Sequence, residues 1–337
     1  MNELAAIVRE ARAALNAGKP AVLATVVAVR GSAYRRPGAR MLVTGDGWRA
    51  GSISGGCLEA ELTRQAAFLV SHGRALVRSY DTAEDAGARL GCGGEVDVLL
   101  EPLKSMAFLD VLARVTQGRE SIDVRTAIET RTGEREVRVG GALVHSTTTA
   151  PLAGVRCFEE RIDPSPRLIV VGAGHDAMPV ARFADELGWS VDVYDWRPGL
   201  LTKDRFPTAS RCLASASELS SRLQVEPGVL AVVMAHHLDY DAAALAVLLR
   251  DASVSSVGLL GPRHRSAQVL ALIESRGRLT EAQRSRLKAP VGLDLGAEGP
   301  AAIALSIIAE AQAALTGRTG VPLSARETAA EDAAEHG

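Results

Sequence analysis

Two of the four cysteines in this 337-residue chain stand in glycine-rich stretches whose setting favours thiol chemistry. Cys57 follows Ser54-Gly55-Gly56, and the apolar residues after it recur at helical spacing, so a loop delivers the thiol to a helix N-terminus. A thiolate is favoured there, and it acts as a nucleophile or as a ligand for a soft metal. Cys92 has a similar setting beside Gly93-Gly94. Each is thus a candidate functional thiol, and the alternative is a small buried side chain at a tight turn.

A second candidate site lies where an apolar strand ends in Gly172-Ala173-Gly174 and a helical pattern follows. This order is typical of dinucleotide-binding loops, in which Gly172 permits the tight bend and Gly174 lets a phosphate approach the helix N-terminus. Asp195 ends the next strand, where an acid can accept hydrogen bonds from ribose hydroxyls. The pattern predicts binding of a phosphate-bearing ligand, and the alternative is a turn kept for packing alone.

Three histidines accompany this second pattern. His175 lies inside the loop, where it either donates a hydrogen bond to a phosphate or pterin oxygen or lies in solvent. His236 and His237 end a later strand, at the edge where open α/β sheets bind ligands. Because consecutive strand residues point to opposite faces, a metal site made by both is not favoured. Asp239 and Asp241 follow as predicted helix caps.

The elements that position these residues differ between the two halves of the chain. In the first half the patterns predict a helix from Leu4 to Leu15, a strand from Ala21 to Val29, a hairpin of 41–44 and 48–52, a helix from Leu58 to Val70, and a strand from Glu95 to Glu101. From Ser105 to Asp163 the signals weaken to one amphipathic helix and short β-like runs. From Arg167 to Ala314 apolar strands alternate with helices, which predicts βαβ units and a parallel sheet.

The predicted fold class is therefore α/β, with an N-terminal α/β domain followed by a Rossmann-like parallel-sheet domain. The boundary is placed at Asp163-Pro164-Ser165-Pro166, because proline blocks helix continuation and regular strand pairing. The predicted parts are an N-terminal domain with the glycine-rich cysteine loops (1–104), a small β-rich connector (105–163), the Rossmann-like domain (164–315) and a disordered tail (316–337).

Composition narrows the function classes. The chain is 47% hydrophobic and 23% charged, with a net charge of -2, so it carries no global electrostatic footprint for nucleic acid or an anionic membrane. No stretch approaches the roughly 20 apolar residues of a membrane span, and the first residues do not resemble a secretory signal. The cysteines form no CxxC pair and no disulfide framework. A cytoplasmic globular protein is expected.

Four separated motifs together resemble the xanthine dehydrogenase accessory (XdhC/CoxI) family. They are the run from Gly51 to Glu59 (GSISGGCLE), Gly91-Cys92-Gly93-Gly94, Gly172-Ala173-Gly174-His175, and the run from Pro290 to Ala297 (PVGLDLGA). The likeness extends from about Glu3 to Ala314, in the order of the family. Asp176 departs from it, since an apolar residue is expected there and an inward-pointing acid would repel a pyrophosphate.

The resemblance implies a molybdenum cofactor-binding chaperone that protects the cofactor and helps to insert it into an apo molybdenum hydroxylase of the xanthine, aldehyde or carbon monoxide dehydrogenase type. It implies an accessory factor more than a catalyst, a homodimer, and as partners the large subunit of the hydroxylase and a cysteine desulfurase or cofactor-synthesis enzyme. The implied cofactor contacts are Cys57, also as metal ligand, with Ser54, Gly55, Gly56, Cys92, Gly172, Gly174, His175, Asp195 and His236.

Two other classes of function stay open at this point. An NAD(P)-dependent oxidoreductase would explain the pattern from Gly172 to Asp195, although no Tyr-Lys pair or His-Asp relay accompanies it. A scaffold protein with an inactive Rossmann domain would tolerate loss of the Cys57 thiol.

Overall fold

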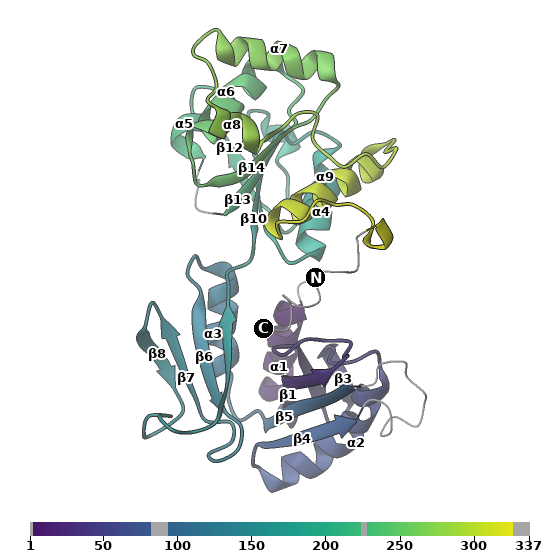
Figure 1. The fold of residues 1–337 in the computed structure, drawn as a ribbon, viewed down its shortest axis with the longest axis vertical. Helices are drawn as coiled ribbons and strands as arrows, with labels where there is room; N and C mark the ends of the chain where they lie inside the picture. The colour runs from purple at the N-terminus through teal and green to yellow at the C-terminus, as the bar shows by residue number, and fades with distance from the viewer. Residues whose placement is uncertain (1–2, 82–93, 224–227, 326–337) are drawn as a thin grey trace. The chain divides into compact units, whose positions relative to one another are not determined.

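The computed structural model describes residues 3–81, 94–223 and 228–325. The chain divides into two compact units, Met1–Ser165 and Pro166–Gly337 (Figure 1). The predicted loop around Cys92 lies outside the described residues, as does the tail beyond residue 325. Within the described residues, no helix is both long and apolar enough to cross a membrane.

The first unit is built on a five-stranded antiparallel sheet in the order β3-β2-β1-β5-β4. Its strands are β1 (Ala21–Gly31), β2 (Arg40–Thr44), β3 (Gly47–Gly51), β4 (Leu76–Asp81) and β5 (Gly94–Pro102). Strand β1 is buried on both faces, because side chains alternate along it and helices cover each side. Ala21 and Leu23 pack toward helices α1 (Glu3–Asn16) and α3 (Ala107–Gln117), whereas Val22 and Ala24 pack toward α2 (Cys57–His72).

A second, four-stranded antiparallel sheet completes the first unit, in the order β8-β7-β6-β9. Its strands are β6 (Ile122–Ala127), β7 (Arg135–Val139), β8 (Ala142–Ser146) and β9 (Cys157–Ile162). Helix α3 packs on both sheets through one apolar cluster. Two buried ion pairs also join the sheets, Arg40 with Glu160 and Arg135 with Glu101. Residues 105–163 therefore share a core with the preceding strands.

The second unit is a six-stranded parallel sheet in the order β12-β11-β10-β13-β14-β15. Its strands are β10 (Arg167–Val171), β11 (Ser190–Asp195), β12 (Ser210–Leu213), β13 (Val229–Val233), β14 (Val254–Leu259) and β15 (Leu287–Lys288). Numbered within the unit, this order is 3-2-1-4-5-6, which is the Rossmann arrangement. The predicted α/β class with a parallel-sheet domain is confirmed.

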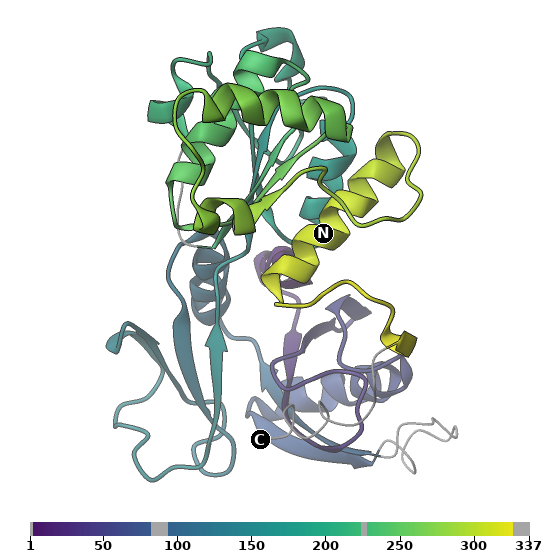
Figure 2. The same ribbon diagram turned by 45° about the horizontal axis from the view of Figure 1, so that its top comes forward.

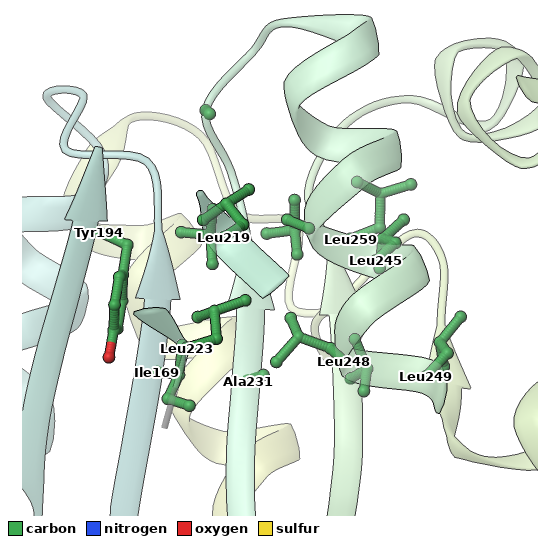
Figure 3. Close-up of a cluster of buried hydrophobic side chains, with 14 of the residues drawn as sticks. Ile169, Tyr194, Leu219, Leu223, Ala231, Leu245, Leu248, Leu249 and Leu259 are labelled. Atoms are coloured by element: carbon green, nitrogen blue, oxygen red, sulfur yellow. The ribbon is translucent and has the colours of Figure 1, made fainter. Parts of the chain in front are cut away.

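Helices cover both faces of this sheet (Figure 2). They are α4 (Ala177–Glu186), α5 (Leu219–Arg222), α6 (Leu238–Arg250), α7 (Arg263–Glu274), α8 (Glu281–Arg286) and α9 (Pro300–Leu315), with short 3-10 turns at Pro198–Leu200 and Leu323–Ala325. Alternate strand residues face opposite layers: Leu168 and Val170 pack toward α4 and α9, whereas Ile169 packs toward α5 and α6. Figure 3 shows the latter cluster, with Leu245 and Leu248 of α6 above the strands.

Candidate functional site

The carboxyl ends of β10 and β13 define the centre of the candidate site in the second unit. The chain leaves β10 toward α4 on one face of the sheet and leaves β13 toward α6 on the other face. Neighbouring parallel strands whose connections diverge in this way leave a crevice between their loops, where open α/β sheets bind ligands.

Gly172 makes the turn after β10, as its position predicts. Its φ is 115°, and its N–H donates to the carbonyl of Tyr194 at 2.7 Å. A Cβ added to Gly172 would lie 2.5 Å from the Cα of Ala235, so only glycine lets the two loops approach this closely. At Gly174 an added Cβ would meet no atom within 4 Å, which leaves open space beside the loop. Gly172 therefore has a backbone geometry that requires glycine, and Gly174 has space beside it into which a ligand group could fit.

Asp195 at the end of β11 is fully buried and bonded to the glycine loop. Its carboxylate accepts from Ala173 N at 2.6 Å and from Arg197 through N, Nε and Nη2 at 2.8, 2.9 and 2.8 Å. Burial opposes ionisation of Asp195, but the hydrogen bonds from Arg197 and Ala173 more than offset it and hold the pKa below its ordinary value. The carboxylate is therefore ionised and fixes the loop against β11.

His175 is exposed at the start of α4 and lines a pocket of about 500 Å³ beside that helix. The pocket also holds Arg205, whose Nη2 donates to the carbonyls of Ala173 and Gly174 at 3.0 and 3.2 Å. Arg182 and further residues from the β11–β12 connection and the start of α9 complete its lining. The loop thus borders a hollow lined by both cationic side chains and the acids Asp185 and Asp204.

His236 and Asp176 face each other across the crevice. His236 has a φ of 60°, which is uncommon for a residue with a Cβ, and its Nε2 lies 3.6 Å from Oδ2 of Asp176. Asp176 is the acid that the sequence places next to the predicted phosphate loop. Its carboxylate therefore lies beside the imidazole of His236. His236 and Asp176 link the loops after β13 and β10.

His237 has different partners from His236. Its Nδ1 accepts from Tyr240 N at 3.3 Å, and its ring meets Trp196 at 5.4 Å between centroids. Among the described residues, no group of three or more His, Cys, Asp or Glu side chains is arranged to hold a metal ion.

The prediction that Asp239 and Asp241 cap the following helix is wrong. Helix α6 begins at Leu238, and His237 is its cap. Asp241 is instead fully buried, accepts from Ala235 N at 3.1 Å, and pairs with Arg265. Desolvation raises the pKa of this carboxyl, and the pairing with Arg265 opposes that shift. Asp241 thus holds the loop after β13 in place through the hydrogen bond from Ala235 N.

In the first unit, Cys57 is the first residue of α2, as predicted, and the loop before it is built around Glu59. Glu59 is 2% exposed. Its Oε1 accepts from Ser52 Oγ, Ile53 N and Ser54 N at 3.0, 3.0 and 2.7 Å. Its Oε2 accepts from Gly56 N at 2.9 Å and from Ser54 Oγ. One carboxylate therefore fixes the whole turn that precedes Cys57.

The charge of Glu59 is stabilised by these bonds. Burial opposes its ionisation, yet the hydrogen bonds from Ser54 and Ser52 hold its pKa below the ordinary value. Glu59 is the last residue of the motif from Gly51 to Glu59, but no role was predicted for it. Its spacing was the available signal, because an acid at the third helical position bonds back to the N-cap N–H, which here belongs to Gly56.

The turn itself is open on its outer side. Gly56 has a φ of 119°, Gly55 and Gly56 are exposed, and an added Cβ at either would meet no atom within 4 Å. Ser54 Oγ accepts from Leu58 N at 3.2 Å, which satisfies one of the free donors of α2. The loop is thus rigid toward the core and accessible at the two glycines.

Together these features define a class: a two-unit α/β protein in which a glycine-rich loop at a helix start precedes a Rossmann unit. Family models agree in both units. Residues 5–81 match the XdhC and CoxI family, and residues 168–311 match the XdhC Rossmann domain.

Relatives and a solved structure extend the match over most of the chain. A probable xanthine dehydrogenase subunit of Bacillus subtilis is 32% identical over 314 residues, covering 86% of this chain and 92% of that protein. The molybdenum cofactor insertion chaperone PaoD of Escherichia coli is 28% identical, covering 90% and 86%. A crystal structure of a xanthine dehydrogenase from Bacillus halodurans superposes with a TM-score of 0.78 at 27% identity, covering 93% and 97%. The chain belongs to the XdhC and CoxI family.

Proposed function

We propose that this protein is an accessory factor that binds molybdenum cofactor, protects it and helps to insert it into an apo molybdenum hydroxylase. The observation that carries the proposal is the Glu59-bonded turn, which holds Gly55 and Gly56 open immediately before Cys57. The name of the Escherichia coli relative, a molybdenum cofactor insertion chaperone, supports the same cargo.

The residues of the turn fit such a cargo. A soft thiolate is a suitable ligand for the metal of the cofactor, and a position at the start of α2 favours the thiolate form of Cys57. The open space at Gly55 and Gly56 gives room for a bulky group immediately before Cys57 in the chain. The cofactor supplies the redox-active metal to the hydroxylase, whereas the part of this chain is to hold it and to exclude oxidants.

The second unit supplies a site for an anionic part of a ligand. Gly172 and Gly174 form the loop before α4, whose first N–H groups attract a phosphate. We propose that this loop, with His175 and His236 beside it, contacts the phosphate-bearing end of the cofactor. Cys92 is proposed as a further cofactor contact on the strength of its motif alone.

The proposed partners follow from this role. They are the large subunit of an apo hydroxylase, a cysteine desulfurase or cofactor-synthesis enzyme, and a second copy of this chain in a cytoplasmic homodimer. Helix α9 offers one apolar position toward a partner, since Leu305 is 55% exposed. Light scattering on the purified chain measures the oligomeric state directly.

The test of the proposal is co-purification. The protein is expressed with cofactor synthesis active, purified without oxygen, and assayed for pterin and molybdenum. We expect both in the wild type, a loss in Cys57→Ser, and retention in Cys157→Ser, which changes a half-buried thiol of β9. Absence of both ligands from the wild type, or full retention by Cys57→Ser, contradicts the proposal.

The Rossmann strand order also fits an NAD(P)-dependent oxidoreductase. The contacts of Asp195 count against an NAD-dependent form of such an enzyme, because the acid that would bind the ribose diol of NAD is bonded to Ala173 and Arg197. Hydride transfer to or from a nicotinamide, measured by absorbance with candidate substrates, would favour this alternative over a carrier.

A further inference from the structure

We propose that Arg197 determines ligand specificity in the second unit, and that the site takes a ligand with a phosphate monoester beside β11 in place of a ribose diol held by an acid. This inference goes beyond the proposed function and does not depend on it, since it concerns the chemistry of the β11 edge whatever the rest of the ligand is.

The first step is that Asp195 has no acceptor capacity left for a diol. An ionised carboxylate offers about four lone-pair sites. Four hydrogen bonds fill them, one from Ala173 and three from Arg197. A ribose hydroxyl would have to displace a donor from a fully buried carboxylate, which leaves that donor unpaired and costs about 1 to 3 kcal/mol.

The second step is that the guanidinium of Arg197 is held in place before any ligand arrives. Its Nε and Nη2 bond the two oxygens of Asp195 as a fork, and its central carbon lies 4.2 Å from the centroid of the Trp196 ring. Trp196 is itself packed on Tyr240, at 4.3 Å between centroids. The cation is therefore preorganised, so little side-chain entropy is lost when it binds an anion.

One edge of the Arg197 guanidinium is exposed to solvent. Arg197 is 38% exposed at its side chain. Among the residues that the structure describes, no acceptor is bonded to its Nη1. The Nε and Nη2 atoms of this guanidinium bond a carboxylate, and its other edge lies in solvent. That edge carries only N–H donors, which suits a phosphate.

The guanidinium of Arg197 lies close to the glycine loop. Nη2 of Arg197 and N of Ala173 both donate to the same oxygen, Oδ2 of Asp195. Arg197 therefore lies next to the loop that precedes α4. Arg205 adds a second cation to that loop through the carbonyls of Ala173 and Gly174, and Asp176 has His236 as its neighbour. Arg197 and Arg205 are thus two cationic side chains beside the glycine loop.

The experiment is calorimetric titration of the full chain with NADP+ and NAD+ in phosphate-free buffer, since these two probes differ only in one phosphate monoester at the ribose. We expect NADP+ to bind at least about tenfold more tightly, a difference of about 1.4 kcal/mol. Arg197→Gln removes the charge and the fork, so the preference should disappear. Arg197→Lys keeps the charge without the fork and should show a smaller preference.

Arg250→Gln is the matched control, because Arg250 is exposed in the last turn of α6, at the far end from the cap His237. It should keep the wild-type preference, as should Cys57→Ser, which separates this inference from the carrier proposal. Equal or tighter binding of NAD+, binding of neither probe, or a preference that survives in both Arg197 variants overturns the inference.

Discussion

Glu59 illustrates how a single buried side chain sets the geometry of a loop. Five donors converge on its carboxylate, three of them backbone N–H groups of the turn before α2. Backbone donors in a glycine-rich turn have few other partners, so the acid replaces the hydrogen bonds that regular secondary structure would provide. The turn is ordered by this carboxylate at the point where the chain reaches Cys57.

Removal of the Glu59 charge should therefore destabilise the first unit. In Glu59→Gln the amide nitrogen faces donors that it cannot accept from, and we expect a loss of about 3 kcal/mol in the free energy of unfolding. Urea denaturation measures it. Glu61→Gln is the control on the same helix, because Glu61 is partly exposed and its bonds within the described part of the chain go to Arg64 and Gln65; its change should stay within about 0.5 kcal/mol.

The same variant has a pH signature. The folded pKa of Glu59 is depressed, so its charge stabilises the fold above the unfolded pKa of about 4.3 and this contribution is lost as pH falls through the folded value. The stability difference between wild type and Glu59→Gln should be full at neutral pH and shrink below about pH 4. A difference that is constant across this range would contradict the assignment of charge to Glu59.

Residue-level prediction from sequence succeeded where backbone geometry alone decides the residue type. Gly172 is required by a positive φ and a close approach of two loops, and the strand-glycine-helix pattern signals both. Asp195 was placed correctly at the end of its strand, but its partners were not predicted. Arg197 lies only two positions further on, and its return to Asp195 depends on a turn that periodicity does not encode.

At the scale of elements, the close approach of the chain after β10 to the chain after β13 limits which residues can replace Gly172. Gly172→Ala combines a φ of 115° with a Cβ 2.5 Å from backbone atoms of Ala235. Backbone hydrogen bonds hold both strand ends in place, from Gly172 N to the carbonyl of Tyr194 and from Met234 N to the carbonyl of Val171. We expect a loss of more than about 3 kcal/mol. Gly174→Ala meets open space and should cost less than about 1 kcal/mol. Thermal unfolding compares them, and equal melting temperatures would refute this account of the turn.

Elements with strong apolar periodicity were predicted closely, and elements defined by tertiary contacts were not. Helix α1 spans Glu3–Asn16, close to the helix from Leu4 to Leu15 that the apolar pattern predicts. Strand β9, Cys157–Ile162, alternates weakly and carries charged residues, and only its pairing with β6 makes it a strand. Helix α6 starts at Leu238, before both predicted caps Asp239 and Asp241, because the side chain of His237 takes the cap.

At the scale of the whole molecule, the chain joins two units with different means of binding. The first offers a rigid, open turn before a cysteine, and the second offers cations and a glycine loop at a sheet edge. The function proposed for the chain is that of a molybdenum cofactor carrier. The family of the chain and the name of its Escherichia coli relative accord with this proposal.

X-ray absorption at the molybdenum edge counts the sulfur neighbours of the metal. Measured on the anaerobically loaded protein, it tests whether Cys57 is a ligand of the molybdenum. We expect one sulfur neighbour fewer in Cys57→Ser than in the wild type, and the wild-type number in Cys157→Ser. Identical sulfur coordination in wild type and Cys57→Ser would contradict the claim that Cys57 holds the cofactor.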